Sequence, residues 1–371
     1  MSNKKIGILT FHQALSYGAK LQAYALQNFL TEQGIDNEMV DYTCDYMYKR
    51  LIRPIRVGTK RRLRSFVRSL ITMKQTGIDR RKSIEFRQKY MKLSRPYTEE
   101  NIADASNYFD AFITGSDQVW SPVCVGFDPV YFLNFAKPEQ KYSYAASIGE
   151  KVLPEDKKAD YEKLLADFQR YSVRESSAAE IIKDLNGRDA QVHVDPTLLL
   201  SAKQWDKIVS RPEQVPETEP FIFLFNVKRA SRLFEYAKYL SEKTGLKVYY
   251  LQKQRIHRLD FVTYLDPVMA NEFVWLIKNA KYVVTNSFHG TVFSVIYKKE
   301  FAVEFDHYKG RNIRAEELLQ DLHIYGREIT KTENPNPSSP VDWDYVDERI
   351  AQHRQNSLDY INTIAEDLDI K

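Results

Sequence analysis

KIGILTFHQALSYGAKLQAYALQNFLTEQG, residues 5–34, contains one complete strand–loop–helix unit. The apolar run at residues 6–11 is too short for a buried helix and predicts a strand. After a polar loop, apolar side chains recur at the spacing of one helix face, at Leu21, Ala25, Leu26, Phe29 and Leu30. Gly34 then ends the helix. The stretch therefore predicts the first strand and helix of a parallel α/β sheet.

The same alternation of strand and helix continues along the chain. Further strands are expected at residues 38–42, 111–114, 142–146, 170–173, 191–194, 221–225, 246–251 and 282–285. A chain of 371 residues is expected to form more than one domain, and the prolines near residues 212–220 indicate a boundary. The sequence predicts an N-terminal Rossmann-like domain at 1–210, a second at 220–333 and, after a linker with three prolines, a helical segment at 341–371. The two domains are expected to face a cleft.

Composition excludes several classes of protein. Lys and Arg number 54 against 50 Asp and Glu, so the total charge does not indicate a nucleic-acid partner. The two cysteines, Cys44 and Cys124, are too few and too far apart for a disulfide scaffold, an iron–sulfur cluster or a zinc ribbon. The apolar run near the N-terminus is followed at once by polar residues and does not resemble a signal peptide. We expect a cytoplasmic protein whose membrane contact, if it has one, is peripheral.

One segment departs from the balanced charge. Residues 49–95 contain seventeen Lys or Arg but only two acidic residues, Asp79 and Glu85. Apolar residues interleave with the basic ones at near-helical spacing, which is typical of a basic amphipathic helix. The segment predicts a helical arm inserted in the N-terminal domain. It is expected either to contact an anionic membrane surface or to form a solvated helical face whose long stems cover apolar surface.

The common signatures of nucleotide, zinc-protease, hydrolase and calcium sites are missing. The sequence contains no GxGxxG, GxxxxGK[ST], HExxH, GxSxG or EF-hand pattern. Asp342-Trp343-Asp344 has the DxD form found in metal–nucleotide sites, but it follows the proline-rich linker rather than a strand, which favours a helix cap. No set of metal ligands is evident, so a divalent cation is optional, and we expect no cofactor.

Four loops follow apolar strands, where open α/β sheets bind their ligands. They cover residues 10–18, 114–120, 172–175 and 286–291. The residues in them that we consider candidates for binding are His12, Tyr17, Gly18, Ser116, Asp117, Arg174, Asn286, Ser287, His289 and Gly290. Histidine suits proton transfer and arginine suits anions. For two candidates a structural role is a clear alternative: Arg174 as a bridge to Glu175 or Asp195, and Asp117 as a helix cap. Asp195-Pro196-Thr197 is expected to shape a turn.

Six blocks in these and neighbouring segments together resemble the polysaccharide pyruvyl transferase family. They are SYGAKLQAYAL at 16–26, GSDQVW at 115–120, YSYAASIG at 142–149, SVRE at 172–175, VDPTLLL at 194–200 and TNSFHGT at 285–291. The resemblance spans roughly residues 5–330. It implies a fold similar to the GT-B glycosyltransferases, with phosphoenolpyruvate as donor substrate and a pair of glycan hydroxyls as acceptor.

The resemblance also implies roles for individual residues. The family's histidine falls on His289, as proton donor to the methylene carbon, and its arginine in the SVR block falls on Arg174, as donor ligand. The family's arginine two residues before the histidine is replaced by Ser287. Arg311 or Arg314, shortly downstream, is expected to take its place.

Two other functions remain open from the sequence. One is a GT-B-type glycosyltransferase that uses a nucleotide sugar, because the folds are similar and Ser287 weakens the donor argument. The other is a non-catalytic protein that binds a sugar phosphate. A lipid-linked glycan would supply both the acceptor and the anionic surface for residues 49–95. No RNA-binding module is recognisable, so no nucleic-acid partner is expected.

Overall fold

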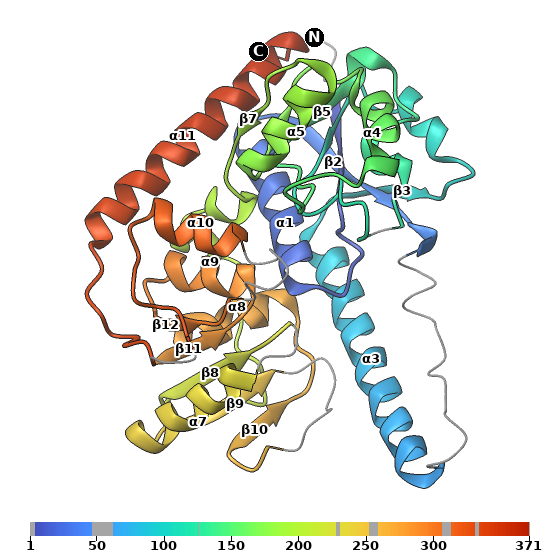
Figure 1. Ribbon diagram of the computed structural model, residues 1–371. Helices are drawn as coiled ribbons and strands as arrows, with labels where there is room; N and C mark the ends of the chain where they lie inside the picture. The colour runs from blue at the N-terminus through green and yellow to red at the C-terminus, as the bar shows by residue number, and fades with distance from the viewer. Residues whose placement is uncertain are drawn as a thin grey trace. The chain divides into compact units, whose positions relative to one another are not determined.

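The protein was analysed as a computed structural model that describes residues 4–46, 62–124, 126–227, 231–251, 259–305, 313–330 and 334–370. The chain forms two compact units. The first comprises Met1–Arg53, Arg87–Leu200 and Ile350–Lys371, and the second comprises Pro54–Phe86 and Ser201–Arg349. Figure 1 traces the chain from its N-terminus in blue to its C-terminus in red.

The first unit contains a parallel five-stranded sheet of order β3-β2-β1-β4-β5. Its strands are β1 (Lys5–Leu9), β2 (Asp36–Tyr42), β3 (Leu93–Tyr97), β4 (Ala111–Thr114) and β5 (Lys141–Ser143). The order reverses at β1, as in a Rossmann sheet, and ligands of such sheets bind at the carboxyl ends of the strands near that point. The central strands are almost wholly buried because their apolar runs pack on both faces.

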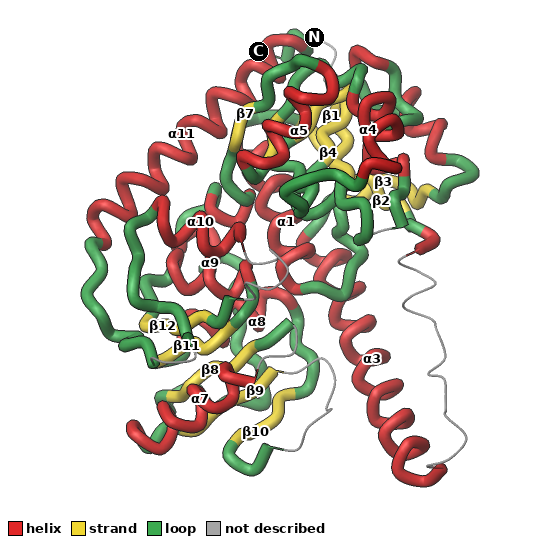
Figure 2. Tube along the Cα trace, viewed as in Figure 1, coloured by secondary structure: helices red, strands yellow, loops and turns green. Residues whose placement is uncertain are grey.

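The remaining elements of the first unit extend and cover this sheet. Strands β6 (Ser172–Val173) and β7 (Gln191–Val192) pair in parallel, and bridges from Tyr142 and Ala146 connect them to the β5 side. The helices are α1 (Tyr17–Glu32), α4 (Lys158–Leu165) and α5 (Ser176–Asn186), with short 3-10 turns η1 (Ile102–Asn107), η2 (Pro129–Phe132), η3 (Pro138–Gln140), η4 (Glu155–Lys157) and η5 (Pro196–Leu198). Figure 2 separates these helices from the strands by colour.

The second unit repeats the Rossmann-like plan. Its parallel sheet has the order β10-β9-β8-β11-β12. The strands are β8 (Phe221–Phe225), β9 (Lys247–Leu251), β10 (Val262–Leu265), β11 (Tyr282–Thr285) and β12 (Glu300–Val303). The helices are α6 (Ala202–Trp205), α7 (Ser231–Thr244), α8 (Ala270–Asn279), α9 (Phe288–Ile296) and α10 (Ile313–Asp321). The prediction of two Rossmann-like domains is confirmed.

The two units differ from the predicted domains at their borders. The second unit begins at Ser201 rather than near residue 220. The expected C-terminal segment is one helix, α11 (Trp343–Asp367), which contributes its first residues to the second unit and the rest to the first. The local sequence pattern predicts the helix, but the unit against which the helix packs depends on residues far away in the sequence. None of the helices in the described part of the chain combines the length and apolarity needed to cross a bilayer.

The predicted basic arm is only partly described, because residues 47–61 lie outside the described ranges. From Arg62 the chain forms one helix, α3 (Arg62–Tyr90). Its residues up to Phe86 belong to the second unit, not to the N-terminal domain. Lys82 lies 3.8 Å from Glu272 of α8, and Phe86 is buried. The ion pair links α3 to α8 of the second unit.

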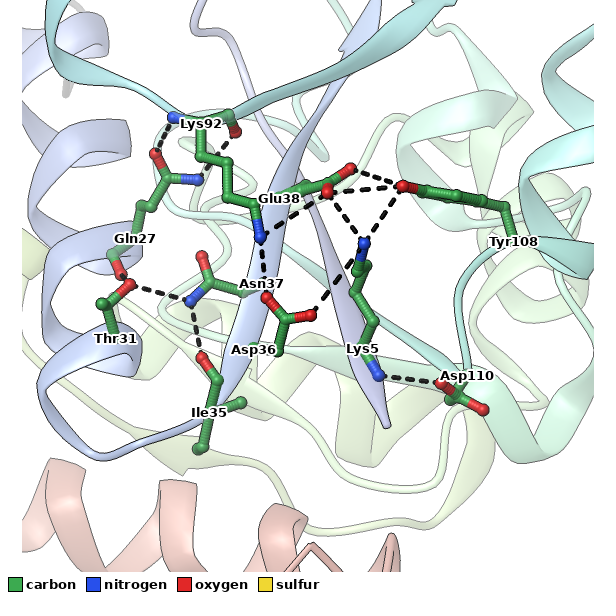
Figure 3. Close-up of polar contacts among 10 residues, drawn as sticks. All are labelled: Lys5, Gln27, Thr31, Ile35, Asp36, Asn37, Glu38, Lys92, Tyr108 and Asp110. Atoms are coloured by element: carbon green, nitrogen blue, oxygen red, sulfur yellow. Dashed lines mark hydrogen bonds and ion pairs between the residues drawn. The ribbon is translucent and has the colours of Figure 1, made fainter. Parts of the chain in front are cut away.

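At the amino ends of β1, β2 and β3, a charged network fixes the first sheet (Figure 3). Lys5 Nζ lies 2.8 Å from Glu38, which also accepts a hydrogen bond from Tyr108. Lys92 Nζ lies 2.8 Å from Asp36. The hydrogen bonds to Glu38 and Tyr108 raise the pKa of Lys5 well above its usual value. The network lies at the edge opposite the carboxyl ends, so we interpret it as structural.

Candidate functional site

A chain of buried polar side chains crosses the carboxyl edge of the first sheet. Gln22 of α1 donates to Thr10 Oγ1 at 2.8 Å, and the Thr10 hydroxyl donates to the backbone oxygen of Ser116 at 3.0 Å. Ser116 Oγ in turn accepts a hydrogen bond from Arg174 Nη2. The predicted candidates Ser116 and Arg174 therefore meet, although 58 positions separate them in the sequence.

Arg174 is held by a buried ion pair. Its Nη2 lies 2.7 Å from Asp195 Oδ2, with side-chain exposures of 3% and 0%. The other oxygen of Asp195 accepts hydrogen bonds from the backbone nitrogen of Thr197 at 2.9 Å and from its hydroxyl at 2.6 Å. Asp195 thus forms the predicted turn and pairs with Arg174 as well. Arg174 therefore forms the ion pair with Asp195 that the sequence offered as an alternative to donor binding. That Arg174 binds the donor stays a prediction.

The loop after β5 is fixed by a second carboxylate. Glu175 Oε1 accepts hydrogen bonds of 2.9 Å from the Ser147 hydroxyl and from the backbone nitrogens of Ile148 and Gly149. Asp117 reaches the same loop, because its backbone oxygen accepts from the Ser147 nitrogen at 3.0 Å. Asp117 does not cap a helix. It has a positive φ of 68° and accepts from its neighbour Gln118.

Helix α1 begins at the predicted loop after β1. Tyr17 and Gly18 form its first turn and are buried. Ser16 occupies the N-cap position, but its side chain makes no capping hydrogen bond. Lys20, which was not predicted from the sequence, is only 1% exposed. Its Nζ donates a hydrogen bond to the Ala14 carbonyl and lies 5.7 Å from the centre of the Tyr17 ring.

His12 contacts an aspartate that the sequence reasoning also missed. The ring is fully buried; its Nδ1 lies 3.1 Å from the Thr10 carbonyl and its Nε2 lies 3.0 Å from Asp41 Oδ1. Asp41 stands at the carboxyl end of β2, 29 positions from His12. An acidic residue at the end of the second strand of a Rossmann unit was the signal available in the sequence.

In the second unit, the predicted loop 286–291 forms the first turn of α9. Ser287 is the N-cap residue, and its Oγ accepts from the Gly290 backbone nitrogen at 3.2 Å. Position 290 requires glycine, because a Cβ there would come within 2.7 Å of Thr285 Oγ1. Asn286 accepts a hydrogen bond of 2.9 Å from the Val227 nitrogen after β8. His289 therefore occupies the second helical position of α9, directly after β11.

Arg314 lies beside this turn. Its guanidinium carbon is 5.1 Å from the centre of the Phe288 ring. The centre of the His289 ring lies 5.0 Å from the centre of the Phe288 ring. Arg314 and His289 therefore both neighbour the Phe288 ring at the first turn of α9. Arg311 lies outside the described residues. Ser287, where the resemblance implies an arginine, acts here as a helix cap.

Two further acidic residues have structural partners. Glu304, just after β12, accepts a hydrogen bond from the Leu233 nitrogen in α7 at 2.8 Å, and burial raises the pKa of its carboxyl. Asp342 accepts from the Tyr345 nitrogen at 3.0 Å at the start of α11. The DxD sequence therefore provides the expected helix cap.

Solved structures share the fold. A structure of a putative UDP-N-acetylglucosamine 2-epimerase from Listeria monocytogenes aligns with a TM-score of 0.51 and 10% identity, covering 100% of this chain and 91% of that one. The S. aureus MnaA–UDP structure aligns with a TM-score of 0.50 and 12% identity, covering 99% and 98%. At such identities the likeness shows the fold alone, which is GT-B-like.

Comparison with curated proteins finds no match. A family model described as polysaccharide pyruvyl transferase matches residues 17–303. The matched region includes the first turn of α1, Ser116, Arg174 and the His289 turn, and it covers most of the chain. The chain belongs to the polysaccharide pyruvyl transferase family.

Proposed function

We propose that the protein transfers the pyruvyl group of phosphoenolpyruvate to two hydroxyls of a cell-surface polysaccharide precursor, forming a cyclic ketal. A proton adds to the methylene carbon, which becomes the methyl group. One sugar oxygen bonds to the central carbon, the bond from that carbon to the phosphate oxygen breaks, and the second sugar oxygen closes the ketal. Of the two protons that the hydroxyls lose, one balances the proton added to carbon and the other leaves with phosphate.

The observation that carries this proposal is that His289 lies in the first turn of α9 and that Arg314 lies against Phe288 of the same turn. The N-terminus of a helix favours anions, because its backbone dipoles place partial positive charge there. A guanidinium beside that end adds a full positive charge and a fork of donors that matches carboxylate or phosphate. Phosphoenolpyruvate carries both groups.

Histidine suits the proton transfer that the reaction requires. Its side chain carries a proton that it can donate and recover near neutral pH. In the proposed mechanism His289 protonates the methylene carbon while Arg314, with Arg311, holds the donor. Arg174 is the second proposed donor ligand. The family provides the acceptor class, a polysaccharide.

The proposal is tested by incubating the purified protein with phosphoenolpyruvate and a panel of glycosides, followed by assays of phosphate release and of the mass gain of the ketal. Both products are required, because phosphate alone would also arise from simple hydrolysis. Turnover of a nucleotide sugar without any use of phosphoenolpyruvate would instead indicate the glycosyltransferase alternative.

A further inference from the structure

A constrained carboxylate lies at the carboxyl edge of the first sheet. Three donors converge on a single oxygen of Asp41: His12 Nε2 at 3.0 Å, Gln13 Nε2 at 2.7 Å and Arg87 Nη1 at 3.3 Å. The His12 side chain is buried, whereas the side chains of Arg87 and Asp41 keep 15% and 20% of their surface exposed. Among the residues that the structure describes, none donates a hydrogen bond to the second oxygen, Oδ2. The carboxylate is thus fixed on one side and accessible on the other.

The surroundings of Asp41 keep it ionised. Burial opposes the charged form of Asp41. The hydrogen bond and charge of His12, the amide of Gln13 and the charge of Arg87 favour the charged form and outweigh burial. The pKa of Asp41 therefore lies below its usual value. A carboxylate with a lowered pKa is a poor proton acceptor but a strong acceptor of hydrogen bonds. Its exposed oxygen therefore suits the binding of hydroxyl groups.

The position of Asp41 within the sheet indicates that the hydroxyl groups it binds belong to a sugar. It is on β2, which lies next to β1 in a sheet of order β3-β2-β1-β4-β5. In dinucleotide-binding Rossmann units an acidic residue near the end of the second strand hydrogen-bonds the ribose 2′-hydroxyl, so the fold can present a carboxylate to a sugar hydroxyl at this position. The adjacent Thr43 hydroxyl lies 3.3 Å from Gln13 Nε2, so a hydroxyl and an amide stand beside the carboxylate. Such polar groups are typical of carbohydrate sites.

We propose that Asp41, held by His12, Gln13 and Arg87, binds the hydroxyl pair of a sugar through its second oxygen. In the proposed reaction this sugar is the acceptor, and Asp41 holds the two hydroxyls that become the ketal oxygens. The inference rests on the proposed function for the identity of the sugar as acceptor. A carboxylate that binds a pair of hydroxyls would also suit the ribose of a nucleotide. The experiment therefore tests both glycosides and a nucleotide.

The test compares Asp41→Asn with Asp36→Asn. Asp36 is the matched control, because it lies at the other end of the same strand and is paired with Lys92. Asp41→Glu is a second variant that retains the charge and moves the carboxylate by one methylene. Binding is measured by saturation-transfer NMR with methyl galactoside, methyl mannoside, the same glycosides with the hydroxyl pair blocked as an acetal, and UDP.

We expect the free glycosides to bind the parent and the Asp36→Asn variant, and the blocked glycosides to bind neither. Both Asp41 variants should bind the free glycosides at least about tenfold more weakly, because a hydrogen bond to a charged group is lost or misplaced. Unchanged glycoside binding in the Asp41 variants, or no glycoside binding by the parent, would overturn the inference. Loss of UDP binding alone would also overturn it and identify the sugar as a ribose.

Activity separates this inference from the proposed function. If ketal formation occurs, Asp41→Asn should raise the KM for the acceptor while the KM for phosphoenolpyruvate stays unchanged. An unchanged acceptor KM would overturn the role of Asp41 and leave the reaction standing. If no ketal forms but glycoside binding still depends on Asp41, the proposed reaction fails and the hydroxyl site stands.

Discussion

The guanidinium of Arg174 lies 2.7 Å from the carboxylate of Asp195, and both side chains are buried within the first unit. A buried ion pair is costly to break, because removing one partner leaves the other charge unpaired in a medium of low polarity. A residue of this kind can stabilise the fold, bind a substrate or do both, and the two roles require separate measurements.

Arg174→Ala should lower the free energy of unfolding by about 3 to 5 kcal/mol, as measured by urea denaturation. Arg174→Lys should recover part of that stability, since an ammonium can still pair with Asp195. If Arg174 also binds the donor, the lysine variant should not recover the KM for phosphoenolpyruvate, because a point charge does not replace a planar fork. A lysine variant with the parent's donor KM would leave Arg174 a purely structural role.

His289→Ala should reduce kcat for ketal formation about a hundredfold to ten-thousandfold, the usual contribution of a general acid. The control is Ser294→Ala, five positions later in the same helix, which removes the hydrogen bond from Ser294 Oγ to the Gly290 carbonyl. That variant should cost about 1 kcal/mol of stability through loss of a buried hydrogen bond and retain most of the turnover. A folded His289→Ala protein with the parent's kcat would exclude the residue from the chemistry.

Arg314→Ala should raise the KM for phosphoenolpyruvate, because its guanidinium lies beside the Phe288 ring at the proposed anion-binding turn. The effect should exceed that of removing Arg349, which is paired with Asp321 in the same unit. Donor titrations of both variants provide the comparison. Normal donor binding by both Arg314→Ala and Arg311→Ala would show that neither residue replaces the arginine absent at position 287.

Stability should depend on pH through His193. Burial lowers the pKa of this ring from 6.5 to about 4, and the ring packs against both Tyr144 and Tyr360, at centre-to-centre distances of 5.8 and 4.8 Å. The unfolded chain therefore binds a proton more readily than the folded one, so the stability from His193 is complete above pH 6.5 and falls as the pH drops toward 4. The loss should reach about 3 kcal/mol.

Urea denaturation at several pH values measures this loss. His193→Gln, which cannot be protonated, should flatten the stability profile between pH 6.5 and pH 4. His323→Gln, which replaces an exposed histidine, should leave the slope as it is. An unchanged slope in the His193 variant would contradict the prediction.

The basic segment 49–95 should bind anionic vesicles, with each Lys or Arg near the surface contributing about 1 kcal/mol before screening. Affinity should fall as salt shortens the Debye length from about 10 Å at 0.1 M to about 3 Å at 1 M. Replacing Arg61, Arg62, Arg64 and Arg68 with glutamine should weaken cosedimentation. A control variant loses the same charge elsewhere, at Lys157, Lys158, Lys163 and Lys183. Equal cosedimentation of the two variants would contradict a specific membrane contact.

Local patterns predicted the buried strands well. Residues 221–225 and 111–114 were predicted with their observed bounds, because each is an apolar run that the core encloses on both faces. Strand β3 (Leu93–Tyr97) was missed, since it is a polar strand at the edge of the sheet and contains Pro96, which only an edge tolerates.

The site was only partly predictable, for a different physical reason. The loops that carry Arg174 and His289 follow strands, so their positions could be read from the sequence. Asp41 was missed, because its role depends on His12 and Gln13 after β1 and on Arg87 in α3, two segments that only the folded chain brings next to β2. The burial of Arg174 against Asp195 could be named only as an alternative, since pairing across loops depends on tertiary structure.

The central claim is that phosphoenolpyruvate is the donor and a sugar hydroxyl pair the acceptor. Its most direct test is mass spectrometry of a glycoside incubated with the protein and phosphoenolpyruvate labelled with carbon-13, with phosphate release followed in the same reaction. The account predicts one labelled ketal on the glycoside for each phosphate released, and neither product with the His289→Ala variant. Phosphate release without a labelled glycoside, or no consumption of phosphoenolpyruvate with any acceptor in the panel, would contradict it.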